Sequence, residues 1–416
     1  MSQFTLIQNG DVYSPEPLGR PDVLLCLENI LKVGDVDQKG LSAAGFEVDV
    51  IDAAGCLVTP GFIDPHEHLL GGSGEEGFST QTPEIAASEI IGSGITTVVG
   101  CLGVDTTMKT MAGLLAKCKG LKEEGLNSFI WTGGYKTPPQ TVTDTISGDI
   151  MFVDEVIGVG EMAIADDRSS EPAPQELARI ASEAANAGKL SNKAGRTHFH
   201  VGSNDNRLEL LFKLLKDFNV KAEWFYPTHI NRSEELIKEA IELAKNGAFV
   251  DIDVVDEDLK KQLEVYFRNG GPAEKLTVSS DASKTSPRNL YNQIGKCFLE
   301  RLYPIERLLP LVTSNTAAAL KHPMKGAIKQ GNFADILVID ADTFELHHVF
   351  SKGKWLFKNG RLNFKEAFLK DSNRTIRLEG EKGSESDAKQ PDSQPEKNNG
   401  SFYSSVKQIN TRDHAA

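Results

Sequence analysis

Long apolar runs, paired cysteines and basic clusters are all missing from this 416-residue chain. Because no window holds 18 consecutive apolar residues, we expect no membrane-spanning helix. The N-terminus lacks a basic region followed by an apolar core, so we expect no signal peptide. The five scattered cysteines contain no Cys-x-x-Cys pair, which indicates reduced thiols in the cytoplasm. A formal net charge of −14 without a basic patch argues against nucleic acid or an anionic membrane as a partner.

The composition that is present, 39% hydrophobic and 25% charged, is typical of a globular protein. Short apolar runs separated by turn residues occupy both ends, at 1–58 and 326–370. Neither block is large enough for its own core, so we expect one discontinuous β domain, a small β-sandwich, built from both. Its last part indicates a hairpin closed by Asn359-Gly360. Residues 371–416 hold almost no large apolar side chain and predict a disordered tail.

The middle of the chain, residues 59–325, alternates eight apolar β-type runs with helical patterns. Leucine and phenylalanine residues in the segment 208–215 recur at i, i+3, i+4 and i+7, and Ser233 is placed to cap the helix that follows. Eight β/α units predict an α/β fold of the (β/α)8 TIM-barrel type. A doubly wound open sheet is the alternative, but it does not require eight units.

The sequence His66-Glu67-His68 closes the first β run. Residues i and i+2 of a strand point the same way, so both imidazoles can converge on one cation while Glu67 faces away. A single pair of this kind is a weak signal, because surface pairs are common. The fifth and sixth runs, however, end at His200 and His229. Because the carboxyl ends of all barrel strands face one bowl, these four histidines predict a metal site.

Two carboxylates close further runs, Glu161 the fourth and Asp281 the eighth. Glu161 is placed to bridge two cations, which would lower the pKa of a shared water and polarise a carbonyl. A buried acid paired with Arg168 is the alternative for this residue. Asp281 would take the proton of that water and return it to a leaving amine. His198 shares a face with His200 but lies deeper, so we interpret it as an interior histidine.

Four polar residues on loops after the β runs fit the two ends of a substrate: Glu75, Tyr135, Arg168 and Arg232. Two guanidinium groups imply a substrate carboxylate, because a forked donor matches planar oxygens. A glutamate at the other end implies an ammonium group. Each arginine alone is equally compatible with a surface salt bridge, but the set favours a function.

The stretches PGFIDPHEHLLGGSGEEG, TGGYKTPP, DRSS, PTHINR, VSSD and GNFADILVID resemble the amidohydrolase superfamily and, within it, the isoaspartyl (β-aspartyl) dipeptidases. The resemblance covers about residues 5–370. It implies a barrel hydrolase with two zinc ions per chain. His66 and His68 would bind one ion, and His200 and His229 the other.

The same resemblance implies a role for each remaining candidate. Asp281 would bind the first metal and act as general acid and base. Glu75 would hold the free α-amino group of the substrate, Arg168 and Arg232 its α-carboxylates, and Tyr135 the developing oxyanion. Family members also tend to form homo-oligomers, which we expect here.

One departure from the family concerns the group between the metals, which is usually a carboxylated lysine. Counting back from Arg168, that place holds Glu161, in a segment one residue longer. Glutamate offers the same carboxylate without added CO2, so we expect it to bridge; Lys136 or a mononuclear site is the alternative. The family also uses a Ser or Thr shortly after the catalytic aspartate for substrate, and either Thr285 or Ser286 fits.

Together these features predict zinc-dependent hydrolysis of the β-aspartyl bond of small dipeptides by a metal-bridging hydroxide. A cyclic-amide hydrolase of the dihydroorotase or hydantoinase kind is the first alternative, and it needs no ammonium holder. A non-catalytic amidohydrolase-like scaffold is the second, but such relatives tend to lose metal ligands, and this chain keeps every candidate.

Overall fold

The computed structural model describes residues 3–255, 258–370 and 372. The predicted disordered tail lies, apart from Ser372, outside the described residues. Within these ranges every helix is too short or too polar to cross a membrane.

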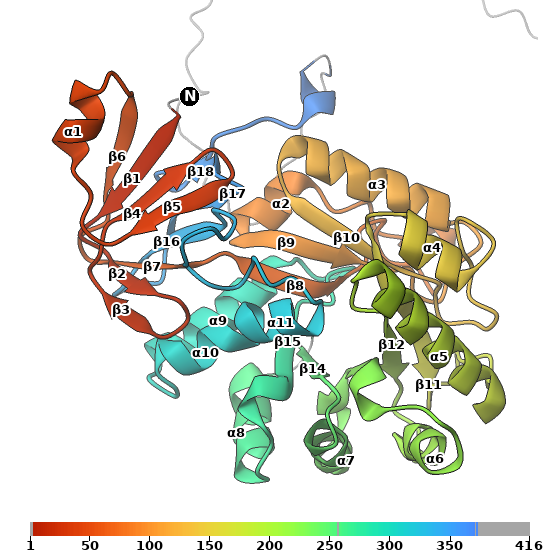
Figure 1. The fold of residues 1–416 in the computed structure, drawn as a ribbon. Helices are drawn as coiled ribbons and strands as arrows, with labels where there is room; N and C mark the ends of the chain where they lie inside the picture. Colours follow the sequence, from red (N-terminus) through yellow and green to blue (C-terminus); the bar gives the residue numbers. More distant parts are fainter. Residues whose placement is uncertain (1–2, 256–257, 371, 373–416) are drawn as a thin grey trace, which may run out of the picture. The chain divides into compact units, whose positions relative to one another are not determined.

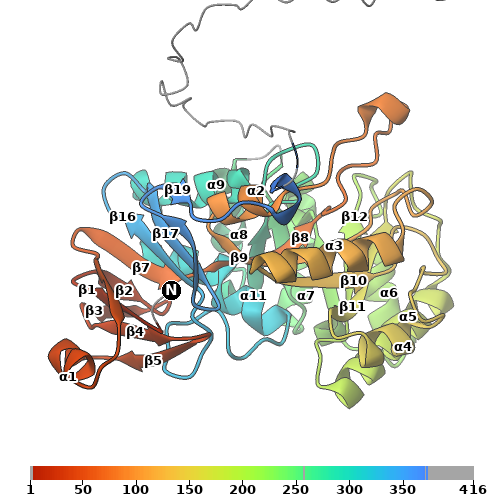
Figure 2. The same cartoon turned by 90° about the horizontal axis from the view of Figure 1, so that it is seen from above.

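Strands from both ends of the chain form two sheets. The first has the order β5-β4-β1-β6 and comes from the N-terminal part, with a short helix before its last strand: β1 (Phe4–Gln8), β4 (Val23–Cys26), β5 (Asn29–Val33), α1 (Gln38–Ala43) and β6 (Val48–Asp52). The second has the order β19-β18-β17-β16-β7-β2-β3 and joins both ends: β2 (Asp11–Tyr13), β3 (Pro17–Gly19), β7 (Cys56–Pro60), β16 (Ile336–Asp340), β17 (Leu346–Ser351), β18 (Lys354–Lys358) and β19 (Arg361–Leu362). Figures 1 and 2 show the red and blue strands side by side.

The two sheets share one apolar core. Ile7 and Val23 of the first sheet pack in the same buried cluster as Val58, Ile336 and Phe350 of the second. Neither chain end could bury these side chains alone, which is why the halves combine. A β-sandwich domain with the boundaries 1–58 and 326–370 stays a prediction.

The hairpin expected at Asn359-Gly360 is present, and a second hairpin precedes it. The Asn359-Gly360 turn joins β18 to the short β19, whereas Lys352-Gly353 joins β17 to β18. All four residues have positive φ angles, of 50°, 75°, 44° and 69° respectively. Such backbone is typical of tight hairpin turns. Because Lys is rarer than Asn or Gly at such positions, the Lys352-Gly353 turn was not identified from the sequence.

The middle of the chain forms a curled parallel sheet. Six strands pair in the order β13-β12-β11-β10-β9-β8, and two more form a separate parallel ladder: β8 (Phe62–Glu67), β9 (Ile95–Gly100), β10 (Asn127–Thr132), β11 (Val156–Ile164), β12 (Arg196–Val201), β13 (Phe225–Thr228), β14 (Val250–Asp253) and β15 (Leu276–Ser279). Nearly every position in these strands is buried. Such strands need apolar cover on both faces, which the barrel type of fold provides.

Hydrogen bonds link the two ladders at both junctions. The side chain of Asn231, after β13, contacts the backbone of Asp253 at the end of β14, with distances of 3.2 and 3.3 Å. At the other junction, His68 N–H donates to the carbonyl of Ala282, 2.9 Å away. Closure of the curl at both sides favours the predicted barrel over the open doubly wound sheet.

Helices lie around the outside of these strands (Figures 1 and 2): α2 (Ala87–Gly92), α3 (Met111–Glu124), α4 (Ile146–Phe152), α5 (Pro174–Ser191), α6 (Glu209–Asp217), α7 (Glu234–Lys245), α8 (Leu259–Arg268), α9 (Arg288–Leu299), α10 (Ile305–Val312) and α11 (Ser314–Ala319). The predicted apolar face of α6 is confirmed, since Leu208 and Leu211 are buried and Phe212 and Leu215 pack half-buried against the same core. Leu214, outside the predicted set, is buried as well. Ser233 caps α7 as expected, since its hydroxyl accepts from Leu236 N–H at 3.1 Å.

Candidate metal centre

The carboxyl ends of the parallel strands bring the six predicted metal ligands together: His66, His68, Glu161, His200, His229 and Asp281. Glu161 lies at the centre of the cluster and is fully buried. Its Oε2 is 3.3 Å from His66 Nε2 and 3.9 Å from His68 Nε2. Its Oε1 is 2.7 Å from His200 Nδ1 and 3.3 Å from His229 Nε2. Each carboxylate oxygen therefore faces a different pair of histidines.

A β-bulge places Glu161 in this position. Val159 pairs with Thr197 and Met162 with Phe199, so β11 advances three residues where β12 advances two. Gly160 lies in the bulge, where an added Cβ would be 2.5 Å from a backbone carbonyl. Because a bulge redirects the side chains beside it, the extra residue turns the glutamate towards the histidines.

Asp281 completes the half of the cluster that contains His66 and His68. Its Oδ1 lies 3.4 Å from His66 Nε2 and 3.1 Å from His68 Nε2. Although His66 is fully buried, neither of its ring nitrogens has a hydrogen-bond partner, and Asp281 Oδ1 also lacks one. Buried polar atoms are rarely left unpaired, and these are the donor atoms that Zn²⁺ prefers.

The ligand atoms fall into groups of the size that a metal ion needs. One set consists of ligand atoms from His66, His68, Cys101 and Glu161, and another of ligand atoms from Glu161, His200 and His229. Within each set the atoms lie within 4.8 Å of one another. The residues present therefore fit a pair of divalent cations that share Glu161.

The charges of the cluster favour an ionised bridge. Burial alone would raise the pKa of Glu161, but the neighbouring charges of His66 and His200 hold it well below its usual range. Burial would likewise raise the pKa of Asp281, and the charges of His66 and His68 lower it. Ionised carboxylates are the forms that bind cations.

Two aspartates that the sequence analysis missed orient the histidines. Asp253 Oδ2 lies 2.8 Å from His229 Nδ1, and Asp166 Oδ2 lies 3.0 Å from His200 Nε2. Carboxylates commonly fix the ring orientation of metal-binding histidines in this way. A signal was available, because Asp253 closes the seventh β run and Asp166 stands two residues before Arg168.

Tyr135 lies beside the second histidine pair. Its hydroxyl oxygen is 2.7 Å from His200 Nδ1, and the side chain is only 5% exposed. Burial and the negative charge of Glu161 raise the pKa of this phenol well above its ordinary value. The hydroxyl therefore keeps its proton and is able to donate a hydrogen bond.

The two predicted arginines gather around Asp166. Arg168 binds both oxygens of Asp166 through its Nε and Nη2, each at 2.8 Å. Its Nη1 donates to Glu75 Oε1 at 2.7 Å, so the two groups expected to hold opposite ends of a substrate pair with each other. Arg232 Nη1 is 3.6 Å from Asp166 Oδ2 and its Nη2 is 3.4 Å from His200 Nε2.

Several alternatives from the sequence are resolved. Lys136 is exposed, and Glu161 rather than Lys136 lies among the histidines. Arg168 pairs with aspartate and Glu75 instead of with Glu161, so that alternative is wrong. His198 lies in the interior as expected, with its ring stacked on Trp131 and its Nδ1 3.0 Å from a backbone carbonyl.

Their hydrogen bonds distinguish Thr285 from Ser286 as candidate substrate-binding hydroxyls. Ser286 Oγ accepts from Arg288 N–H at 3.2 Å, in the turn that begins α9. Thr285 Oγ1 is buried and has no hydrogen-bond partner. Thr285 is therefore the hydroxyl with no partner among the described residues, while Ser286 still has its O–H to donate.

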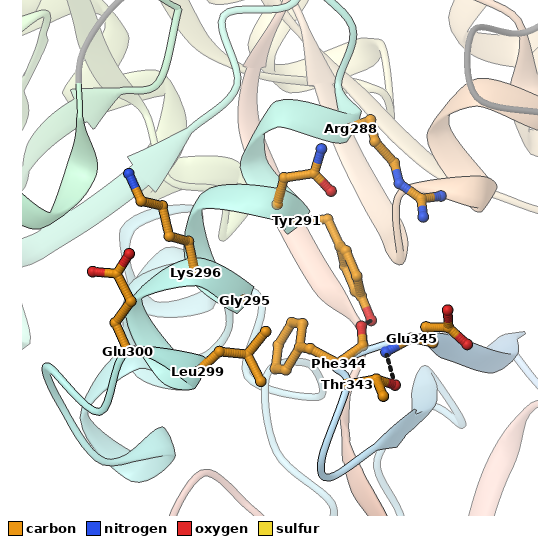
Figure 3. Close-up of a pocket in the computed structure, with 10 residues that line it drawn as sticks. Arg288, Tyr291, Gly295, Lys296, Leu299, Glu300, Thr343, Phe344 and Glu345 are labelled. Atoms are coloured by element: carbon orange, nitrogen blue, oxygen red, sulfur yellow. Dashed lines mark hydrogen bonds between the residues drawn. The ribbon is translucent and has the colours of Figure 1, made fainter.

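A pocket of about 450 Å³ elsewhere lies between α9 and the turn before β17. In Figure 3, Tyr291 and Phe344 lie in the middle of the lining residues, with Lys296 and Glu300 on one side. None of the clustered histidines lines it, so this pocket is separate from the candidate metal centre at the strand ends.

Comparisons with known proteins agree with this geometry. The model of the amidohydrolase family matches residues 57–254. The chain belongs to that family and is a metal-dependent hydrolase. Within the family it resembles β-aspartyl dipeptidase. The structure of that enzyme from Fervidobacterium islandicum AW-1 is 39% identical, has a TM-score of 0.82, and the match covers 87% of this chain and 99% of that one.

A second structure from the same organism contains the dipeptide β-Asp-Leu. It is 37% identical, with a TM-score of 0.82, and the match covers 88% of this chain and 99% of that one. Curated relatives match less completely. A dihydroorotase of Clostridium acetobutylicum is 30% identical over 135 residues, or 31% of this chain. The chain spans 30% of that dihydroorotase and 55% of adenine deaminase 1 of Desulfotalea psychrophila, to which it is 22% identical over 82% of its length.

Proposed function

We propose that this protein hydrolyses the β-aspartyl (isoaspartyl) amide bond of small dipeptides and uses two zinc ions per chain. The observation that carries the proposal is the position of Glu161, whose two oxygens face two separate histidine pairs. Similarity to a β-aspartyl dipeptidase over nearly the whole described chain supports the substrate class. The architecture we propose for it is a (β/α)8 barrel over residues 59–325 beside the β-sandwich of the two chain ends.

The ligands divide between the two ions by their positions. His66, His68 and Asp281 would hold one ion, while His200 and His229 would hold the other, with Glu161 shared between them. When bound, the ions would lower the pKa of a shared water and polarise the scissile carbonyl.

The remaining steps belong to side chains of the chain itself. Asp281, which the neighbouring histidines keep ionised, accepts a proton from the attacking water and transfers it to the departing amine. Tyr135, whose raised pKa keeps the phenol protonated, donates to the oxygen on which negative charge develops.

The charged loop residues select the ends of the substrate. Glu75 binds the free α-ammonium, and Arg168 and Arg232 bind the α-carboxylates. When the dipeptide enters, its charged ends replace the Glu75–Arg168 ion pair, so each side chain keeps a partner of opposite charge. Thr285 Oγ1 adds a hydrogen bond. A required ammonium restricts cleavage to N-terminal β-aspartyl residues.

Turnover of β-Asp-Leu against α-Asp-Leu, with and without a chelator, tests the proposal. We expect cleavage of β-Asp-Leu alone, lost with the chelator and restored by zinc. Equal cleavage of both peptides, or activity that survives complete metal removal, would refute it. A zinc content near two per chain would exclude the non-catalytic scaffold.

A cyclic-amide hydrolase is the second candidate, because of the match to a dihydroorotase. Glu75→Gln separates the two candidates. A dipeptidase should lose about 10–100-fold in kcat/KM, the worth of one charged hydrogen bond, whereas hydrolysis of a cyclic amide should barely change. Glu76→Gln, at the exposed neighbouring position, is the matched control.

A further inference from the structure

Cys101 lies inside the half of the cluster that contains His66 and His68. It follows the last residue of β9, so it stands on the same rim as the predicted ligands. The residue is 1% exposed, and its backbone N–H donates to the carbonyl of Glu67 at 3.0 Å. This bond to the end of β8 fixes the backbone from which the sulfur projects.

The sulfur faces the ligand atoms rather than only apolar neighbours. Cys101 Sγ is 3.9 Å from Glu161 Oε2, 3.8 Å from His68 Nδ1 and 3.7 Å from the carbonyl oxygen of Glu67. It belongs with His66, His68 and Glu161 to a set of four donors within 4.8 Å of one another. Together with Asp281, they would offer this ion five donors, a number that zinc in catalytic sites can reach.

A second observation points independently to a cation at this place. His66 is fully buried, and both of its ring nitrogens lack hydrogen-bond partners. The carboxylate oxygens near its Nε2, Glu161 Oε2 at 3.3 Å and Asp281 Oδ1 at 3.4 Å, are themselves candidate ligands. A cation held by these groups would satisfy the imidazole and lie within reach of the sulfur.

We propose that Cys101 binds, as a thiolate, the metal ion held by His66 and His68, an assignment that rests on the metal centre of the proposed function. On binding, the Sγ–H bond breaks, an Sγ–metal bond forms, and the proton leaves to solvent. The other half, with Glu161, His200 and His229, offers only nitrogen and oxygen.

The two halves of the centre therefore differ in softness. A thiolate selects Zn²⁺, Co²⁺ or Cd²⁺ over the hard ions Mg²⁺ and Mn²⁺. We expect the half with Cys101 to keep a soft ion and the other half to accept a wider range.

Cobalt spectroscopy on the full chain tests the assignment. The protein is stripped with a chelator and reloaded with Co²⁺, and bound cobalt is counted by elemental analysis. We expect a sulfur-to-cobalt charge-transfer band in the near ultraviolet for the wild type and for Cys118→Ser, which removes a fully buried cysteine of α3. The band should vanish in Cys101→Ser.

Affinity provides a second readout. Cys101→Ser should weaken zinc binding by at least about tenfold, since even residues that only support a ligand change metal affinity by about 10–100-fold. Manganese binding should change much less.

The outcomes separate this inference from the proposed function. Bound cobalt without the band, or a band that survives Cys101→Ser, overturns the thiolate assignment and leaves the metal centre intact. If no cobalt binds to the wild type, the metal centre itself fails.

Discussion

The metal cluster and the charged loops beside it are built in opposite ways. Ligands such as His66 and Glu161 are fully buried on strand ends, and both ring nitrogens of His66 lack hydrogen-bond partners. On the loops, Glu75 is 49% and Arg168 is 32% exposed, and they pair with each other. The cluster thus holds buried donor atoms that a cation would satisfy, whereas the loop charges are paired until a substrate replaces them.

The largest expected effect tests the cluster. Glu161→Gln removes one of the two negative oxygens shared by the histidine pairs, so metal retention should fall and kcat should drop by about a thousandfold, equivalent to about 4 kcal/mol. Metal content and turnover of β-Asp-Leu measure this.

The matched control is Glu155→Gln, a buried glutamate just before β11 that pairs with Lys122 instead. Because Glu161 needs no CO2, reloading of the wild-type apoenzyme with zinc should not depend on bicarbonate. A strong dependence would point to a carboxylated lysine and contradict the assignment.

An intermediate effect is expected where the two regions meet. Tyr135→Phe removes a single hydroxyl 2.7 Å from His200 Nδ1. The loss of one donor to a developing oxyanion lowers kcat by about 10²–10³-fold. KM should change little, and both metals should stay bound. Tyr266→Phe, which removes a hydroxyl bonded to the carbonyl of Pro272, is the control. Loss of metal from Tyr135→Phe would instead assign the tyrosine to the cluster.

The smallest effect should come from the loops. Arg168→Lys keeps the charge but loses the forked contact with Asp166, so kcat/KM should fall about tenfold, mainly through KM. Added salt should also raise the KM of the wild type, because it screens the attraction between Arg168 and the substrate. Arg207→Lys, whose side chain is also 32% exposed and pairs with Glu239, is the control. An unchanged KM would remove Arg168 from the substrate site.

The ligand cluster could be predicted from the sequence because, in a barrel, residues that end different strands lie close together in space. His200 and His229 end β-type runs, and strands of one parallel sheet deliver such ends to one rim. The strand period likewise brought His66 and His68 together. These inferences needed only periodicity, which the printed sequence contains.

The sequence did not reveal the contacts between side chains on loops and side chains on strands. The pairing of Glu75 with Arg168, and the support that Asp166 and Asp253 give to histidines, depend on backbone geometry after each strand. The role of Cys101 was hidden because a buried cysteine is usually a small apolar residue.

The strand that carries His66 is tied to the far end of the chain. Only Gly61 separates β7 from β8, and its N–H donates to the carbonyl of Asp335 while Pro60 pairs with Ile336. During synthesis, β7 gains its neighbour β16 only after the ribosome has made more than three hundred residues, whereas β8 pairs with β9, which follows soon after it. A truncated nascent chain therefore leaves β7, the strand that leads into β8, with an open edge.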